Sequence, residues 1–160
     1  MTRANIIIFQ DCFPKKVYFE LTSSAYPSHV LDSIVRFCTE HIFRHTKPEG
    51  QTKTIYNRIS DIALRDFVQD LCPSISQVGN PDYFYDIDLI TGTLKVWKYK
   101  NKWIYAPLDW KEKGWHCCEE KNGRAGYTKA VRGKLLLNMS IFQLEGLTEV
   151  MCGEELIKLV

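Results

Sequence analysis

The feature that most constrains the fold is a change of hydrophobic period about halfway along the chain. From residue 83 onward, apolar and aromatic side chains recur in strand-like runs at residues 83–90, 94–99 and 103–108. Residues 91–92 and 100–102 separate these runs and predict tight turns, because short polar or glycine-bearing links join antiparallel strands. The second half of the chain is therefore predicted to form an antiparallel β-sheet with meander connections.

The first half carries both strand and helix periods. Residues 6–9 and 16–21 are β-type runs on either side of a proline-bearing link, which predicts a β-hairpin. Apolar residues between Val30 and Ile42 share one arc at 100° per residue and predict a helix that Ser28 would cap. A second helix is predicted from Ser60 to Cys72, where Pro73 would stop it, with a polar loop over residues 73–82.

These patterns predict one α+β domain over residues 1–160: an N-terminal β-hairpin, two helices, then a C-terminal antiparallel β-sheet (meander). No run of about 18 apolar residues is present, so no membrane contact is expected. The apolar run near the N-terminus has four residues, too short for a signal-peptide core. Six scattered cysteines fit free thiols in a reducing compartment. We therefore expect a cytoplasmic protein.

The strongest functional signal is a cationic, aromatic stretch from residue 92 to residue 134. It holds all four tryptophans and eleven Lys/Arg against four acids, a net charge of +7, whereas the remaining residues carry −5. Within it, Lys98 and Lys100 alternate with Trp97 and Tyr99, so one strand face mixes aliphatic residues with charge and the other carries rings. This asymmetry predicts an acidic partner.

Rings that stack on bases and lysines that neutralise phosphates suit single-stranded nucleic acid. We predict a small non-catalytic binding protein that uses this sheet face to bind nucleic acid, without cofactor or metal. The predicted contact residues are Lys95, Trp97, Lys98, Tyr99, Lys100, Lys102, Trp103, Tyr105, Arg124, Lys129 and Arg132, with Lys134 as a further phosphate contact.

Two alternatives stay open for this stretch. An acidic protein surface would suit the same face, which would make the chain an inhibitor or adaptor that blocks an acidic or nucleic-acid-binding site on another protein. Tryptophan and tyrosine are also good strand formers, and four tryptophans in one sheet would serve equally well as its core.

Cys38, His41 and His45 are candidate metal ligands, because their i, i+3, i+7 spacing directs them to one side of the first helix. His116, Cys117 or Cys118 would supply a fourth ligand for zinc. No C-x-x-C pair is present, and a buried cysteine beside helix-terminal histidines explains the same pattern without metal.

The sequence also offers a resemblance to a nuclease. Pro81-Asp82, followed after 26 residues by Asp109-Trp110-Lys111, resembles the motif spacing of the PD-(D/E)xK nuclease superfamily. The resemblance implies that Asp82 and Asp109 bind Mg²⁺ and that Lys111 stabilises charge. Asp86 and Asp88 are alternative acids on the run at residues 83–90. Phosphate-loop, dinucleotide-binding, G-x-S-x-G and H-E-x-x-H motifs are absent from the sequence.

Overall fold

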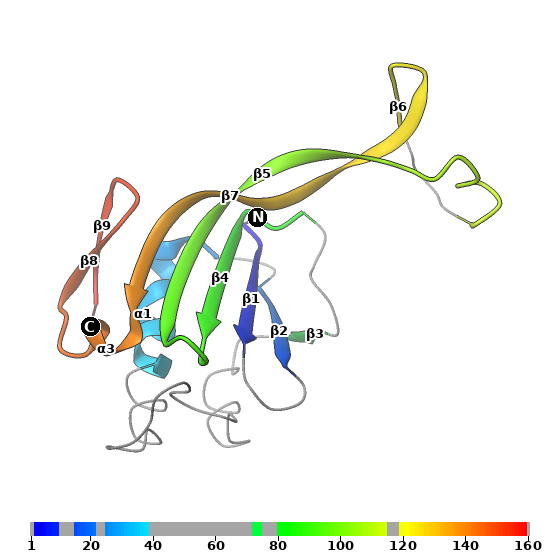
Figure 1. Cartoon of the computed structure of the whole chain (residues 1–160). Coiled ribbons are helices and arrows are strands. Elements are labelled where there is room, and N and C mark those ends of the chain that lie inside the picture. Colours follow the sequence, from blue (N-terminus) through cyan, green and yellow to red (C-terminus); the bar gives the residue numbers. More distant parts are fainter. Residues whose placement is uncertain are drawn as a thin grey trace.

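The computed structural model describes residues 2–9, 15–21, 25–38, 72–74, 80–114 and 119–159. Its main strands are β1 (Ala4–Phe9), β2 (Lys16–Leu21), β3 (Cys72–Ser74), β4 (Tyr83–Asp88), β5 (Thr93–Tyr105), β6 (Glu119–Lys121) and β7 (Arg124–Ser140). They form a seven-stranded sheet in the order β3-β2-β1-β4-β5-β7-β6 (Figure 1). The predicted α+β class is confirmed.

The N-terminal hairpin is confirmed and belongs to the same sheet as the later strands. β1 pairs antiparallel with β2, and on its other side it pairs parallel with β4. The C-terminal strands β4, β5 and β7 pair antiparallel, as predicted, but they share one sheet with the hairpin through the parallel β1–β4 pair, which was not predicted. β1 is buried along nearly its whole length, as expected for a strand with neighbours on both edges and packing on both faces.

The predicted turn at residues 100–102 is also wrong, because β5 runs unbroken from Thr93 to Tyr105. The 17-residue strand β7 pairs with it almost from end to end and keeps these residues extended. Gly126 and Gly133 lie inside β7. A Cβ on Gly133 would lie 2.8 Å from the Lys98 carbonyl oxygen, so glycine permits close approach where the register shifts.

The second predicted helix lies outside the described residues, except for its expected last residue. Cys72 begins β3, which pairs antiparallel with β2 at the edge of the sheet, so neither the helix end at Cys72 nor a loop starting at Pro73 holds. Pro73 is tolerated there because an edge strand has one side without ladder hydrogen bonds.

The first predicted helix is present as α1 (Pro27–Phe37), and residues 39–45 of the prediction lie outside the described residues. Ser28 does not cap it. The N-cap is Tyr26, whose carbonyl accepts hydrogen bonds from His29 and Val30, and Pro27 occupies the first turn. Proline suits that position because its missing N–H would have no intrahelical acceptor.

The core lies between α1 and one face of the sheet. Leu31 and Ile34 of α1 pack with Ile6 of β1, Ile87 of β4 and Val96 of β5, all buried. The Tyr85 hydroxyl reaches the carbonyl of Ala25 at 2.6 Å, which ties the sheet to the segment before α1.

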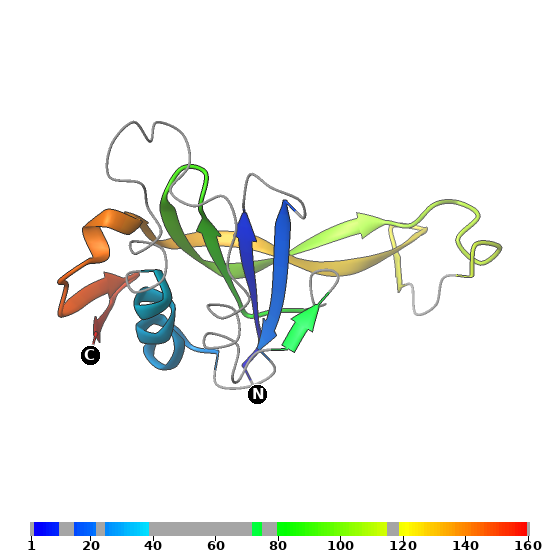
Figure 2. The same cartoon turned by 90° about the horizontal axis from the view of Figure 1, so that it is seen from below.

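The C-terminal residues form a hairpin of β8 (Glu149–Cys152) and β9 (Glu155–Lys158), preceded by the short helix α3 (Ile141–Leu144). Val150 and Ile157 of the hairpin complete the core, with α1 beside β9 (Figures 1 and 2). The sequence of residues 154–160 is compatible with either a short helix or a strand, and the structure forms a strand there.

Candidate functional site

The candidate site lies on a projecting β-ribbon, which we call the arm. Lys98 is the last residue of β5 that pairs with β4. Beyond Lys98, the only described strand that pairs with β5 is β7. The arm comprises residues 99–105 of β5, residues 124–132 of β7, and the segment between them that includes β6. Figures 1 and 2 both show it extending well beyond the rest of the sheet.

Lysines and rings alternate along β5, so they occupy opposite faces of the arm. The lysine positions are Lys98, Lys100 and Lys102. The ring positions are Tyr99, Trp103 and Tyr105. The two residue types expected to share one binding surface are thus separated by the strand alternation over this part of β5.

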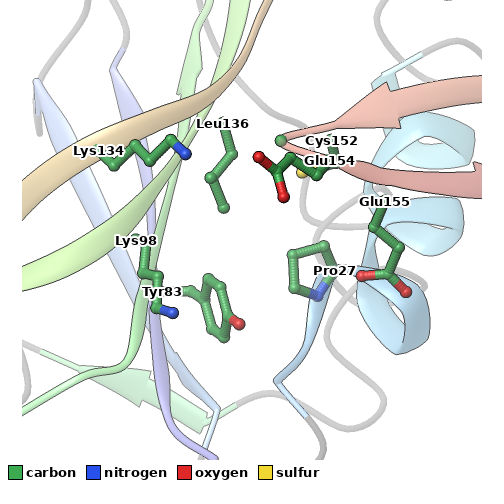
Figure 3. Close-up of a pocket in the computed structure, with 9 residues that line it drawn as sticks. Pro27, Tyr83, Lys98, Lys134, Leu136, Cys152, Glu154 and Glu155 are labelled. Carbon is green, nitrogen blue, oxygen red and sulfur yellow. The ribbon is translucent and has the colours of Figure 1, made fainter.

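The lysine face continues onto β7. Lys102 lies directly opposite Lys129 in the β5–β7 ladder. At the register shift, Lys98 and Lys134 line the same pocket, which places them on one face (Figure 3). We call this set the lysine row: Lys98, Lys100, Lys102, Lys129 and Lys134, all exposed.

No member of the lysine row forms an ion pair within 4.0 Å to any residue that the structure describes. Like charges placed directly opposite each other, as Lys102 and Lys129 are, destabilise a strand pair. The arm therefore carries a cationic face whose lysines form no direct ion pair with its described acids.

On the other face, cationic groups lie over two of the three rings, Trp103 and Tyr105. Trp103 and Tyr105 meet edge to face with centroids 6.1 Å apart. The Lys121 ammonium lies 5.5 Å from the centroid of the Trp103 indole, and the Arg124 guanidinium 4.8 Å from the centroid of Tyr105. Trp103 also lies over Gly126, where a Cβ would come within 2.6 Å of the indole. These contacts hold the two arm strands together.

Trp97 and Arg132 contact an acid at the root of the arm. The Asp86 carboxylate accepts a hydrogen bond from Trp97 Nε1 at 2.9 Å and two from Arg132 at 2.7 Å each. The Arg132 guanidinium also stacks over Phe84, 5.0 Å from its centroid. Lys95, half-buried, is the cross-strand partner of Asp86. These predicted contact residues are thus set apart from the lysine row.

The acids of the nuclease resemblance do not come together. The Asp82 carboxylate accepts a hydrogen bond from the backbone N–H of Arg3. The backbone carbonyl of Asp82 accepts one from the backbone N–H of Tyr99. Asp109 lies past the far end of β5 and pairs with Lys113 at 3.6 Å. Residues 99–105 alone span roughly 20 Å of extended strand. Asp82 and Asp109 therefore share no metal-binding geometry.

The proposed zinc ligands lie mostly outside the described residues, as His41, His45 and residues 116–118 do. Cys38 is fully buried, and burial raises the pKa of its thiol. Within the described ranges, no group of three or more His, Cys, Asp or Glu side chains is placed to hold a metal ion.

A pocket of about 450 Å³ lies where the lysine row meets the β8–β9 hairpin. Figure 3 shows Lys98 and Lys134 on its sheet side and Glu154 and Glu155 on its hairpin side, with the Tyr83 ring beside Lys98. The sequence reasoning missed this pocket, because nothing in the sequence connects the C-terminal tail with residue 98.

Burial shapes the chemistry of two pocket groups. Burial, followed by neighbouring acidic groups that include Glu155, raises the pKa of the Tyr83 hydroxyl above its ordinary value of 10.0. Burial and Glu155 also raise the pKa of the Cys152 thiol to about 11. Both groups therefore keep their protons at neutral pH, and Cys152 is a poor nucleophile there.

The chain matches no protein-family model, no curated protein and no solved structure at a significant level. Within the described residues, no helix combines the length and the apolar character that crossing a membrane requires.

Proposed function

We propose that the arm binds nucleic acid and that the lysine row contacts the phosphates. The observation that carries this proposal is the row itself: five exposed lysines on one face, none of which forms an ion pair within 4.0 Å to a described acid. Phosphate contacts of this kind supply most of the affinity in sequence-independent binding.

The spacing of the row supports a polyanion as the partner. Alternate residues of a strand lie about 7 Å apart, so Lys98, Lys100 and Lys102 present charges at regular intervals. This interval is about twice the 3.4 Å axial rise per nucleotide of one DNA strand. A two-stranded β-ribbon is also narrow enough for the major groove of a duplex.

The rings have a supporting role in this proposal. Tyr99 and Tyr105 are partly exposed, but they lie on the face opposite the row, and Arg124 already stacks on Tyr105. The ring contacts stiffen the arm, and a stiff arm loses less conformational entropy when it binds.

A fluorescence-anisotropy titration with single-stranded and duplex oligonucleotides at several salt concentrations tests the proposal. Five phosphate contacts predict a slope of log K against log salt of about −4.5 for duplex and about −3.5 for single strands. The triple variant Lys100→Gln/Lys102→Gln/Lys129→Gln should reduce the duplex slope by about 2.7 and weaken binding of every sequence alike.

The matched control is Lys15→Gln/Lys16→Gln/Lys158→Gln, which removes the same charge from exposed lysines outside the arm. It should retain most of the affinity. Equal losses in the two triples, or no binding at low salt, would contradict the proposal. A protein partner retained after nuclease treatment and lost only in the row variant would instead support the inhibitor or adaptor alternative.

A further inference from the structure

We infer that the pocket at the root of the arm binds one nucleotide of the strand that follows the lysine row, and selects a base that carries an amino group. This inference rests on the proposed function and adds a ligand for its pocket. The row and the pocket are continuous, because Lys98 and Lys134 belong to both (Figure 3). A backbone that follows the row therefore arrives at the pocket mouth.

The hairpin wall is fixed in place by its turn. Cys152 pairs with Glu155, so Gly153 and Glu154 form a two-residue turn. Gly153 has a φ of +63°, and its N–H donates to the Leu136 carbonyl of β7 at 2.8 Å. This hydrogen bond docks the turn on the sheet, and Glu154 of the turn faces the wall that carries Lys98 and Lys134 (Figure 3).

The two walls carry opposite charges but form no direct ion pair with each other. No ion pair within 4.0 Å joins Lys98 or Lys134 to Glu154 or Glu155, all of which lie in the described part of the chain. A ligand that satisfies both walls needs an anionic group at one end and hydrogen-bond donors at the other. A nucleotide whose base has an amino group meets both requirements.

The chemistry of the walls sets the orientation of this ligand. Lysine attracts a phosphate, whereas an ionised carboxylate repels it and can only accept hydrogen bonds. Glutamate accepts from the N4 amino group of cytosine, and adenine and guanine offer comparable amino donors. Uracil and thymine have no amino group. The ring of Tyr83 and the side chain of Leu136 supply apolar surface for the base.

The size of the pocket is compatible with a mononucleotide. Its volume of about 450 Å³ lies within the usual range of roughly 300–1,000 Å³ for small-molecule sites.

Calorimetric titration of the full-length protein with cytidine, adenosine, guanosine and uridine monophosphates at low salt tests the inference. We expect the affinity for each of the three amino-bearing nucleotides to be at least about fivefold higher than the affinity for uridine monophosphate. Lys134→Gln should weaken all four alike. Glu154→Ala/Glu155→Ala should abolish the discrimination without weakening uridine monophosphate, because it removes both the acceptors and the repulsion of phosphate.

The control Glu145→Ala/Glu149→Ala removes the same charge from exposed positions outside the pocket lining and should leave discrimination unchanged. Equal affinity for all four nucleotides, or no binding of any, would overturn the inference. The proposed function has its own test, which is the binding of oligonucleotides by the triple variant of the lysine row. If that variant loses oligonucleotide affinity while no mononucleotide binds, the arm proposal stands and the pocket inference fails.

Discussion

Arg132 holds Asp86 with two parallel hydrogen bonds of 2.7 Å, from Nε and Nη2 to the two carboxylate oxygens. The Asp86 side chain is 12% exposed and that of Arg132 is 30% exposed, so the pair lies largely out of water. This bidentate pair joins β4, at the centre of the sheet, to β7, the strand that continues into the arm.

We predict that Asp86→Ala lowers the free energy of unfolding by about 2–3 kcal/mol. The substitution leaves a half-buried guanidinium without its counter-charge, and it also removes the acceptor of Trp97 Nε1. Urea denaturation measures the loss. Asp109→Ala is the control, because its 3.6 Å pair with Lys113 is half-exposed and contributes less than about 1 kcal/mol. Equal effects of the two substitutions would contradict the prediction.

Tyr85→Phe should cost about 1–2 kcal/mol. The substitution keeps the buried ring but leaves the Ala25 carbonyl without the hydroxyl that now donates to it at 2.6 Å. Chemical denaturation measures the loss in free energy of unfolding. The control is Tyr99→Phe, which removes a hydroxyl from a partly exposed ring. A loss for Tyr85→Phe no larger than that for Tyr99→Phe would count against this role of the hydroxyl.

Gly126→Ala should loosen the arm and leave the core intact. The added Cβ would lie 2.5 Å from the Ile104 carbonyl oxygen and 2.6 Å from the Trp103 indole, so the indole must move. Overpacking of this kind costs about 1–3 kcal/mol. Hydrogen exchange should accelerate at arm amides and stay unchanged in β1 and β4. Thr128→Ala, an exposed position on the same strand, should leave arm protection nearly unchanged.

Stability should fall as the pH rises from about 9 to about 11. The pKa of Cys152 is raised by burial from an ordinary 9.0 to about 11, so in this window the unfolded chain loses the proton while the folded chain keeps it. Below pH 9 both states hold the proton and the effect vanishes. Urea midpoints at pH 8 and pH 10.5 should differ less in Cys152→Ala than in the parent protein. An unchanged difference would refute the assignment.

Local sequence patterns predicted the elements whose contacts are close in the chain. The hairpin of β1 and β2 and the helix α1 followed from period and from turn residues. The sequence also predicted that Lys98 and Lys100 lie on the opposite strand face from Tyr99, because successive residues of a strand point to opposite faces.

What the sequence could not predict depends on distant pairing. Residues 100–102 resemble a turn, and only the length of β7 shows that they remain extended. In the sequence, Gly126 and Gly133 look like loop residues. The structure shows instead that Gly126 makes room for the Trp103 indole and that Gly133 lies at the register shift between β5 and β7. The pocket joins Lys98 to Glu154, a proximity that depends on the docking of the C-terminal hairpin.

The parallel pairing of β1 with β4 has a consequence for how the protein is made. During synthesis, the first hairpin can form as soon as it leaves the ribosome, yet the inner edge of β1 stays open until Asp88, the last residue of β4, has emerged. Closing such a distant pair carries a large loop entropy, which slows folding. The nascent chain therefore exposes the edge of an apolar strand until β4 is available, and early binding by a chaperone would shield it.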